Sequence, residues 1–236
     1  MTTLQLQTPA TTRKFWSGMS LFCLALLIAP VVATQLGGNY WVRVIDFALL
    51  YIMLALGLNI VVGYTGLLDM GFIAFYAVGA YLAALMASPH LLEVFPILGV
   101  WFPEGLHTSY LLIIPLAALV AAVCGILLGA PTLKLRGDYL AIVTLGFGEI
   151  IRILMRNLDR PVNITNGAKG ITGVDTLNLF GLKFSGVYHW FGFKIPALWL
   201  WYYLLMLVII AIVFVCLRLQ HSRIGRAWHA IREDED

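Results

Sequence analysis

Long apolar stretches separated by short polar segments are the main pattern along this chain. Each stretch has roughly the 20 residues that a helix needs to cross the hydrocarbon core of a bilayer. Backbone groups inside lipid must be hydrogen-bonded within the chain, so we expect helices, and no sheet signal or tandem repeat is evident. The pattern predicts an all-α integral membrane protein, a polytopic bundle of about six transmembrane helices with broken or re-entrant segments. The predicted spans are residues 15–36, 44–62, 70–87, 110–130, 139–155 and 197–217.

The segments around these spans are polar or too short to cross a bilayer. We expect residues 1–14 to form an N-terminal tail, residues 15–217 to form the transmembrane region, and residues 218–236 to start a cytoplasmic segment. Residues 94–102 are apolar but short, which favours an interfacial or re-entrant position. Residues 157–196 form a long polar and aromatic connection.

The composition supports a membrane protein, and the charge distribution predicts its orientation. Of the 236 residues, 61% are hydrophobic and 11% are charged, whereas soluble domains have about 45–50% and about 25%. The net charge of +3 gives no sign of a nucleic-acid partner. Lys and Arg in short loops favour the cytoplasmic side, so we expect both termini inside and residues 88–109, which have neither, outside. The segments predicted inside contain Arg13, Lys14, Lys134, Arg136, Arg218, Arg223, Arg226 and Arg232.

The second predicted span ends in a polar sequence that contains glycines. Asn59, Gly63, Tyr64 and Gly66 precede Asp69, and the next span starts directly after it. Such an ending suggests a broken or re-entrant passage, whose unwound backbone lines a substrate pathway. The alternative is a tight helical hairpin in which Asp69 caps the third helix. Spacing alone leaves both open.

The fifth predicted span contains ionisable residues at membrane depth. Glu149 and Arg152 lie three residues apart on one helical face and form a pair. Thr144 and Gly146 precede them in the same span. A charge inside a bilayer is costly and persists mostly beside a polar cavity or a partner helix. These four residues are therefore candidates for a substrate pathway, and a structural ion pair is the alternative.

The end of the chain, residues 222–236, predicts a short amphipathic helix. Ile224, Ala227, Trp228 and Ile231 share one face. On the cytoplasmic side, such a helix lies on lipid or docks into a groove of a partner protein. The four carboxylates at the end argue against deep burial in an anionic membrane surface, which slightly favours docking.

The sequence indicates no catalytic or metal site. The pattern Gly-x-x-x-x-Gly-Lys-Ser/Thr of a phosphate-binding loop does not occur, so ATP used in transport would be hydrolysed by another subunit. An intramembrane enzyme needs a nucleophile–base pair or a metal cluster. The titratable residues at membrane depth, Asp46, Glu149, Arg152 and Arg156, form neither. We therefore expect no enzyme and no bound cofactor, and we expect the cysteines Cys23, Cys124 and Cys216 to be small buried hydrophobes.

Several stretches resemble one family, the LivM-type permease of branched-chain amino acid ABC importers. They are residues 56–67, 75–82, 131–152 and 225–235, in the same order as in the family. The resemblance covers roughly residues 40–236. It implies a subunit of the bacterial inner membrane that pairs with a second, homologous permease.

The resemblance also implies the other partners and a coupling segment. Two cytoplasmic ATPases, which use ATP and Mg, would drive transport, and a periplasmic binding protein would deliver leucine, isoleucine or valine. Residues 225–235 correspond to the start of the segment that contacts an ATPase. The coupling residues implied in this way are Gly225, Arg226, Ala227, Trp228, Ile231, Arg232 and Glu233.

The resemblance leaves other functions open. The resemblance implies further spans past Asp236, so we expect either a truncated product or fragment, or a longer protein of which these residues are a part. Related permeases transport urea, short amides or other amino acids. A truncated chain that binds its partners but does not transport is a further alternative.

Overall fold

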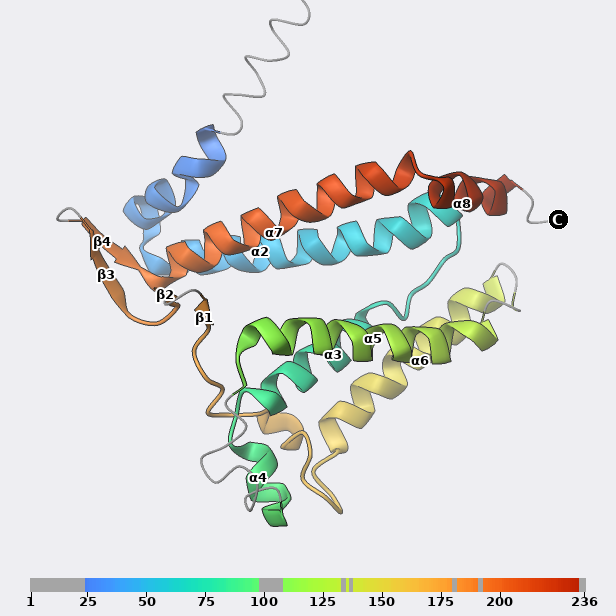
Figure 1. Cartoon of the computed structure of the whole chain (residues 1–236), viewed down its shortest axis with the longest axis horizontal. Helices are drawn as coiled ribbons and strands as arrows, with labels where there is room; N and C mark the ends of the chain where they lie inside the picture. The colour runs from blue at the N-terminus through green and yellow to red at the C-terminus, as the bar shows by residue number, and fades with distance from the viewer. Residues whose placement is uncertain are drawn as a thin grey trace, which may run out of the picture. The chain divides into compact units, whose positions relative to one another are not determined.

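Helices make up most of this chain (Figure 1). The computed structural model describes residues 24–97, 108–132, 135, 138–179, 182–190 and 193–233. The predicted tail 1–14, the first part of the first span and most of the predicted re-entrant segment 94–102 lie outside these residues. The chain divides into two compact units, Met1–Leu50 with Val187–Val208 and Tyr51–Gly186 with Ile209–Asp236.

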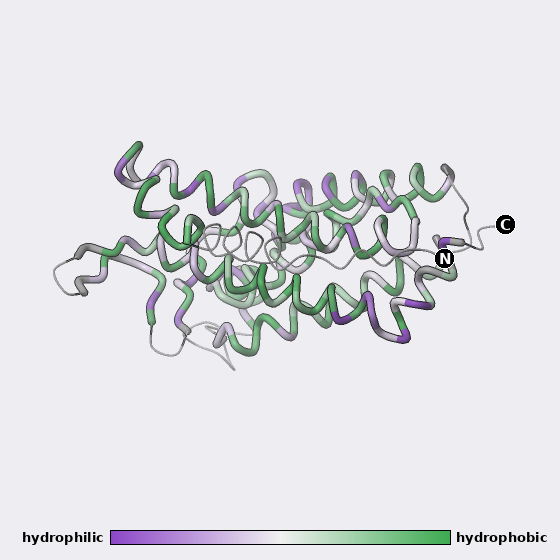
Figure 2. Tube along the Cα trace, turned by 90° about the horizontal axis from the view of Figure 1, so that it is seen from above, coloured by the Kyte–Doolittle hydropathy of each residue, from purple (hydrophilic) through white to green (hydrophobic). Residues whose placement is uncertain are grey.

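Most of the described residues up to residue 157 lie in helices. Hydrophobic residues run along the helices, and hydrophilic residues lie mostly at helix ends and in connections (Figure 2). In chain order the elements are a helix Leu24–Gly37, α2 (Asn39–Asn59), the π-helix η1 (Ile60–Thr65), α3 (Ile73–Met86), α4 (His90–Val94), α5 (Tyr110–Thr132), α6 (Asp138–Asn157), the 3₁₀-helix η3 (Gly167–Lys169), β1 (Asn178–Leu179), β2 (Leu182–Lys183), β3 (Val187–Trp190), β4 (Phe193–Pro196), α7 (Ala197–Gln220) and α8 (Arg223–Glu233).

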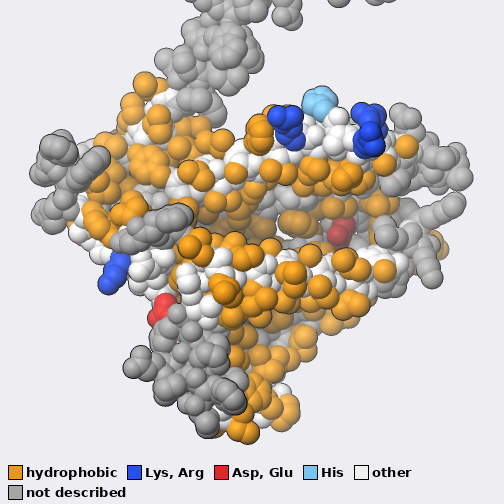
Figure 3. Space-filling model, in the orientation of Figure 1, with side chains coloured by type: hydrophobic (Ala, Val, Ile, Leu, Met, Phe, Trp, Pro, Cys, Tyr) orange, Lys and Arg blue, Asp and Glu red, His pale blue; other side chains and the backbone are white. Residues whose placement is uncertain are grey.

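Length and composition allow three of the described helices to cross a membrane. They are Asn39–Thr65, Tyr110–Ala130 and Ala197–Gln220, and two shorter apolar helices are Leu24–Gly37 and Ile73–Met86. Hydrophobic side chains cover most of the described surface on the face drawn in Figure 3, and many large ones are exposed. Exposed apolar surface on this scale is typical of contact with lipid or other subunits. The predicted all-α membrane class is confirmed.

The expectation that the chain has no sheet was wrong in one segment. The long connection 157–196 contains two antiparallel hairpins, β1–β2 and β3–β4. In the second, Val187 lies opposite Pro196 and Tyr188 opposite Ile195. These strands have only two to four residues, which is too short for the alternation of apolar and polar residues to stand out in the sequence.

In the first unit, aromatic side chains at the start of α7 hold the helix Leu24–Gly37. The Trp199 indole N–H donates a hydrogen bond to Thr34 Oγ1 at 2.9 Å. The Tyr202 hydroxyl, on a residue that is almost fully buried, donates to the Leu26 carbonyl at 2.7 Å. Aromatic residues with a polar tip stabilise such contacts because they bury a large apolar ring and still pair their polar atom.

In the second unit, α3 packs against both α5 and α6. Ala74 on α3, Ile113 on α5 and Leu140 on α6 are buried. The small side chain of Ala74 allows close approach of a neighbouring helix, as small residues do in other packed membrane helices. The three helices cross one another in Figure 1.

The polar connections on one side of this unit lie together. The Asp175 amide donates to the Ala87 carbonyl at 2.7 Å, and the Tyr110 hydroxyl donates to the Asp175 carbonyl at 2.5 Å. His90 Nε2 lies 3.0 Å from the Asn163 carbonyl oxygen. Residues near 88–109 and 157–196, both predicted on the outer side, therefore contact each other.

The link between η1 and α3 is a tight connection. Gly66 ends η1 with a φ of 75°, in the left-handed region that glycine adopts without strain. Asp69 Oδ1 accepts a hydrogen bond from the Gly71 amide at 2.8 Å. The residue at the N-cap of α3 is Phe72, which makes no side-chain cap bond. Asp69 thus closes a turn in front of α3 and does not cap its first turn.

The start of α3 is fixed to α6 by a very close contact. The Met70 amide donates to Thr144 Oγ1 at 3.1 Å. A Cβ on Gly71 would lie 2.5 Å from the Thr144 carbonyl oxygen, and one on Gly148 would lie 3.5 Å from the Gly71 Cα. Any side chain at position 71 would therefore displace the backbone of α6.

We predict that Gly71→Ala destabilises the protein, because the added methyl group forces α3 and α6 apart. Over-packing of this kind costs about 1–3 kcal/mol. The thermal midpoint of the purified protein in detergent and its amount in the membrane measure the effect. Gly79→Ala, within α3, is the control, since nothing lies within 4 Å of a Cβ built there. Equal midpoints for the two variants would contradict the prediction.

Candidate functional site

Two groups of residues that the sequence singled out separately lie against each other in the second unit. The Tyr64 ring of η1 stacks on the Trp228 ring of α8, with centroids 6.1 Å apart and planes inclined by 13°. Arg232 Nη1 donates a hydrogen bond to the Gly63 carbonyl at 3.1 Å. Residues predicted for a pathway and residues predicted for coupling thus form one contact, the η1–α8 contact.

The π-helical turn and its glycines make this contact possible. A π-helix is rare, and single π-helical turns are frequent at functional sites. The carbonyl of Gly63 receives the Arg232 guanidinium. A Cβ on Gly66 would lie 3.2 Å from Arg232 Cγ. The absence of a side chain at Gly66 therefore leaves space for the stem of Arg232.

Gly225 holds α8 to the end of α7. It is buried, and a Cβ there would lie 2.3 Å from the Leu219 carbonyl oxygen and 2.5 Å from that of Gln220. Ser222 Oγ accepts a hydrogen bond from the Gly225 amide at 3.2 Å, as an N-cap residue does. Gly225 therefore has a structural place in the turn.

The predicted coupling residues fall into two sets on α8. Gly225 and Trp228 face the chain itself, and Arg232, although largely exposed, is bonded to Gly63. Arg226 and Ala227 are exposed. For Ile231 and Glu233 the structure describes the backbone in α8 and not the side chains.

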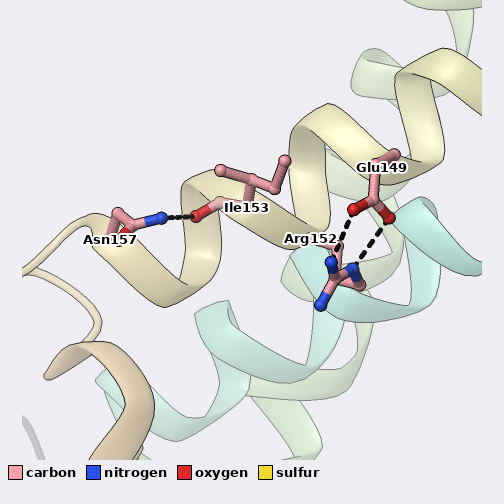
Figure 4. Close-up of polar contacts among 4 residues, drawn as sticks. All are labelled: Glu149, Arg152, Ile153 and Asn157. Atoms are coloured by element: carbon pink, nitrogen blue, oxygen red, sulfur yellow. Dashed lines mark hydrogen bonds and ion pairs between the residues drawn. The ribbon is translucent and has the colours of Figure 1, made fainter.

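Glu149 and Arg152 form the predicted ion pair on α6 (Figure 4). Arg152 Nε and Nη2 donate to the two carboxylate oxygens at 2.8 and 2.5 Å. Both side chains are about half exposed, at 51% for Glu149 and 54% for Arg152. The pair lies in a groove of about 420 Å³ between α3 and α6, the α3–α6 groove. Sites for small ligands commonly have about 300–1,000 Å³.

The other predicted pathway residues lie in three different places. Thr144 is buried, and its hydroxyl donates to the Ala141 carbonyl and accepts from the Met70 amide, so it supports the α3–α6 crossing. Gly146 is exposed, with nothing within 4 Å of an added Cβ. Asn59 lines a second groove, of about 700 Å³, that also includes Asp69. The structure therefore brings together some of the predicted residues and separates others.

Two aromatic residues of the α3–α6 groove were missed in the sequence. Tyr76 and Tyr81 on α3 line it opposite the ion pair. They are five residues apart, and that spacing does not place them on one narrow helical stripe. Their common signal is that each has a hydroxyl within an otherwise apolar helix. The described residues contain no group of three or more His, Cys, Asp or Glu that could hold a metal.

Comparison with known proteins agrees with these observations. The family model described as "Branched-chain amino acid transport system / permease component" matches residues 40–236. Similar proteins are the high-affinity branched-chain amino acid transport system permease proteins LivM of Escherichia coli K12 and of Salmonella typhimurium LT2. Each is 42% identical over 228 residues, which is 91% of this chain and 49% of the relative.

A more distant relative comes from an archaeon. The probable branched-chain amino acid transport permease protein LivM of Methanocaldococcus jannaschii is 25% identical over 205 residues, covering 79% of this chain and 55% of the relative. The chain thus spans about half the length of the curated relatives it matches. No solved structure matches it.

We predict that Trp228→Ala loosens α8 from η1. The variant loses the stack with Tyr64, and an aromatic pair contributes about 0.5–1.5 kcal/mol beyond its buried area, so amide exchange in α8 should rise about two- to tenfold. Hydrogen–deuterium exchange of the purified protein measures this. Trp228→Phe keeps a ring in place and serves as the control. If Trp228→Phe and Trp228→Ala raise amide exchange in α8 equally, the stack with Tyr64 does not hold α8 against η1.

Proposed function

Because the chain belongs to the family of permease components of branched-chain amino acid transport systems, we propose that it is a membrane-spanning subunit of an ATP-driven importer for leucine, isoleucine and valine. The observation that carries this proposal is the family match over residues 40–236, with 42% identity to two LivM proteins. The apolar helices fit a multi-pass membrane protein. The substrates are those in the names of these relatives.

The proposed partners follow from an importer of this type. A second, homologous permease completes the pathway, two cytoplasmic ATPases hydrolyse ATP with Mg, and a periplasmic binding protein delivers the substrate. The chain itself is not an enzyme in this scheme and binds no cofactor. The sequence supports the division of labour, since it contains no phosphate-binding loop of its own.

We propose the bacterial inner membrane as the location, with the N-terminus in the cytoplasm. Contacts within the second unit support the prediction that successive connecting segments alternate between the outer and inner sides of the membrane. Residues in or directly next to the segment 88–109 are hydrogen-bonded to residues of the segment 157–196, and both segments are predicted outside. At the other end, η1 and α8, both at the predicted inner side, are in contact. The predicted spans alternate consistently with these two sets of contacts.

The η1–α8 contact supports a route for coupling. In this proposal an ATPase docks on the exposed side of α8, where Arg226 and Ala227 lie. Movement of α8 then reaches η1 through the Trp228–Tyr64 stack and the Arg232–Gly63 hydrogen bond. Since η1 continues α2, which carries Asn59, such movement acts on a residue predicted to line the pathway.

We predict that cells in which the gene is disrupted lose uptake of labelled leucine, and that the intact gene restores it. Uptake should be measured in a strain without other leucine importers, so that no second system masks the loss. Unchanged uptake would overturn the proposal, and uptake of urea or short amides in place of leucine would change its substrate. Co-purification with the ATPases without substrate-stimulated ATP hydrolysis would indicate a chain that binds partners and does not transport.

We predict that Arg226→Glu uncouples ATP hydrolysis from uptake without removing the protein from the membrane. A reversed charge at an interface opposes docking, and arginines at the centre of interfaces often contribute roughly 2 kcal/mol or more, so uptake should fall about tenfold or further. Lys169→Glu, an exposed substitution at the predicted outer side, is the control. Normal uptake in the Arg226 variant would show that this side of α8 does not dock the ATPase.

A further inference from the structure

The Glu149–Arg152 pair has both partners satisfied and both accessible. Arg152 donates two hydrogen bonds to the carboxylate, so each charge is neutralised in the free protein. Yet about half of each side chain remains exposed. Shielding from solvent therefore does not explain why these two charges are paired. A charged residue in a predicted membrane span normally faces a partner helix or a polar cavity, and this pair lines the α3–α6 groove.

The rest of the groove is largely apolar. Its α3 wall includes Ile73, Tyr76 and Ala77, and its α6 wall includes Leu145 and Met155. A third charged residue, Arg156, also lines it. The groove thus combines one negative and two positive side chains with apolar surface on both walls.

Resting on the function proposed above, we propose that this groove binds the zwitterionic head group of an amino acid by exchange of ion-pair partners. The substrate carboxylate takes the place of Glu149 beside Arg152, and the substrate ammonium group takes the place of Arg152 beside Glu149. The apolar side chain of the substrate lies along Ile73 and Met155. Arg156 adds positive charge on the carboxylate side.

Exchange of this kind suits a transport pathway because no charge is left without a partner at any stage. A single buried charge would be costly without substrate, whereas a pair is neutral with and without it. The protein's own pair competes with the substrate, so binding stays weak enough for release. A transport pathway requires a site that binds the substrate strongly enough for it to enter and weakly enough for it to leave.

The test separates a substrate site from a structural ion pair by removing both charges at once. The double variant Glu149→Gln/Arg152→Gln keeps two polar side chains of similar size and leaves no uncompensated charge. Each single variant, E149Q and R152Q, leaves one charge without its partner. All are introduced into the chromosomal gene, so that the protein acts with its natural partners. Membrane amount and labelled leucine uptake are measured for each.

We expect the double variant to be present in the membrane at the wild-type amount and to lose uptake about tenfold or more, because charge-assisted hydrogen bonds to the substrate are lost. A structural pair gives the opposite result: the single variants are impaired and the double variant regains uptake. Near-normal uptake by the double variant therefore overturns the inference.

A second variant covers the case in which the neutral pair fails to accumulate. The exchange Glu149→Arg/Arg152→Glu keeps both charges and reverses their order along α6. Accumulation with loss of uptake supports the site, since the substrate head group would meet its partners in reversed order. Accumulation with normal uptake overturns it, and so does failure of both double variants to accumulate, because a pair needed for assembly requires no substrate to explain it. Failure of the proposed function is distinct, because it appears in the wild-type strain.

Discussion

The structure depends on one constraint: polar groups among apolar helices must find partners close by. The chain meets this constraint at the start of α3, where the Met70 amide bonds to Thr144 Oγ1 and Gly71 lies against the Thr144 carbonyl. An unpaired backbone group in hydrocarbon costs several kcal/mol, so this contact fixes where α3 meets α6. The α3–α6 groove lies beside this contact, since Met70 and Gly148 both line it. The ion pair of Glu149 and Arg152 is then placed along the wall of that groove.

The same constraint explains the end of α2. The last four carbonyls of a regular helix have no partner within the helix and must find one elsewhere. Here the chain continues as a π-helix, ends at Gly66, and its Gly63 carbonyl is paired by Arg232 from the far end of the sequence. Gly225 acts on the α8 side of this contact, because only a residue without a Cβ allows α8 to begin so close to the end of α7. Gly66 and Gly225, together with the Gly63 carbonyl, therefore determine where α8 and η1 meet.

Much of the fold could be predicted from the sequence, because membrane length and apolar composition are local signals. The stretches predicted at residues 44–62, 110–130 and 197–217 coincide with α2 and η1, α5 and α7. The pair of Glu149 and Arg152 followed from its three-residue spacing. Contacts between distant residues could not be predicted: nothing near Tyr64 indicates that Trp228 stacks on it. The hairpins were missed because their strands are too short to show a period, and the place of Thr144 depends on a backbone amide, which carries no sequence signal.

The position of Trp228 changes how the amphipathic end of the chain is understood. Its apolar face suggested lipid or a partner protein as the surface it contacts, since hydropathy shows that a face is apolar and not what covers it. The structure gives that face, at Trp228, a partner within the chain. Ile224 and Ala227, which share that face, remain exposed, and so does Arg226. The surface that α8 offers to other molecules therefore combines apolar side chains with a positive charge, and charged contacts favour orientation and rapid exchange. In the proposed importer, such a surface lets an ATPase dock on α8 while Trp228 keeps the helix in contact with Tyr64 of η1.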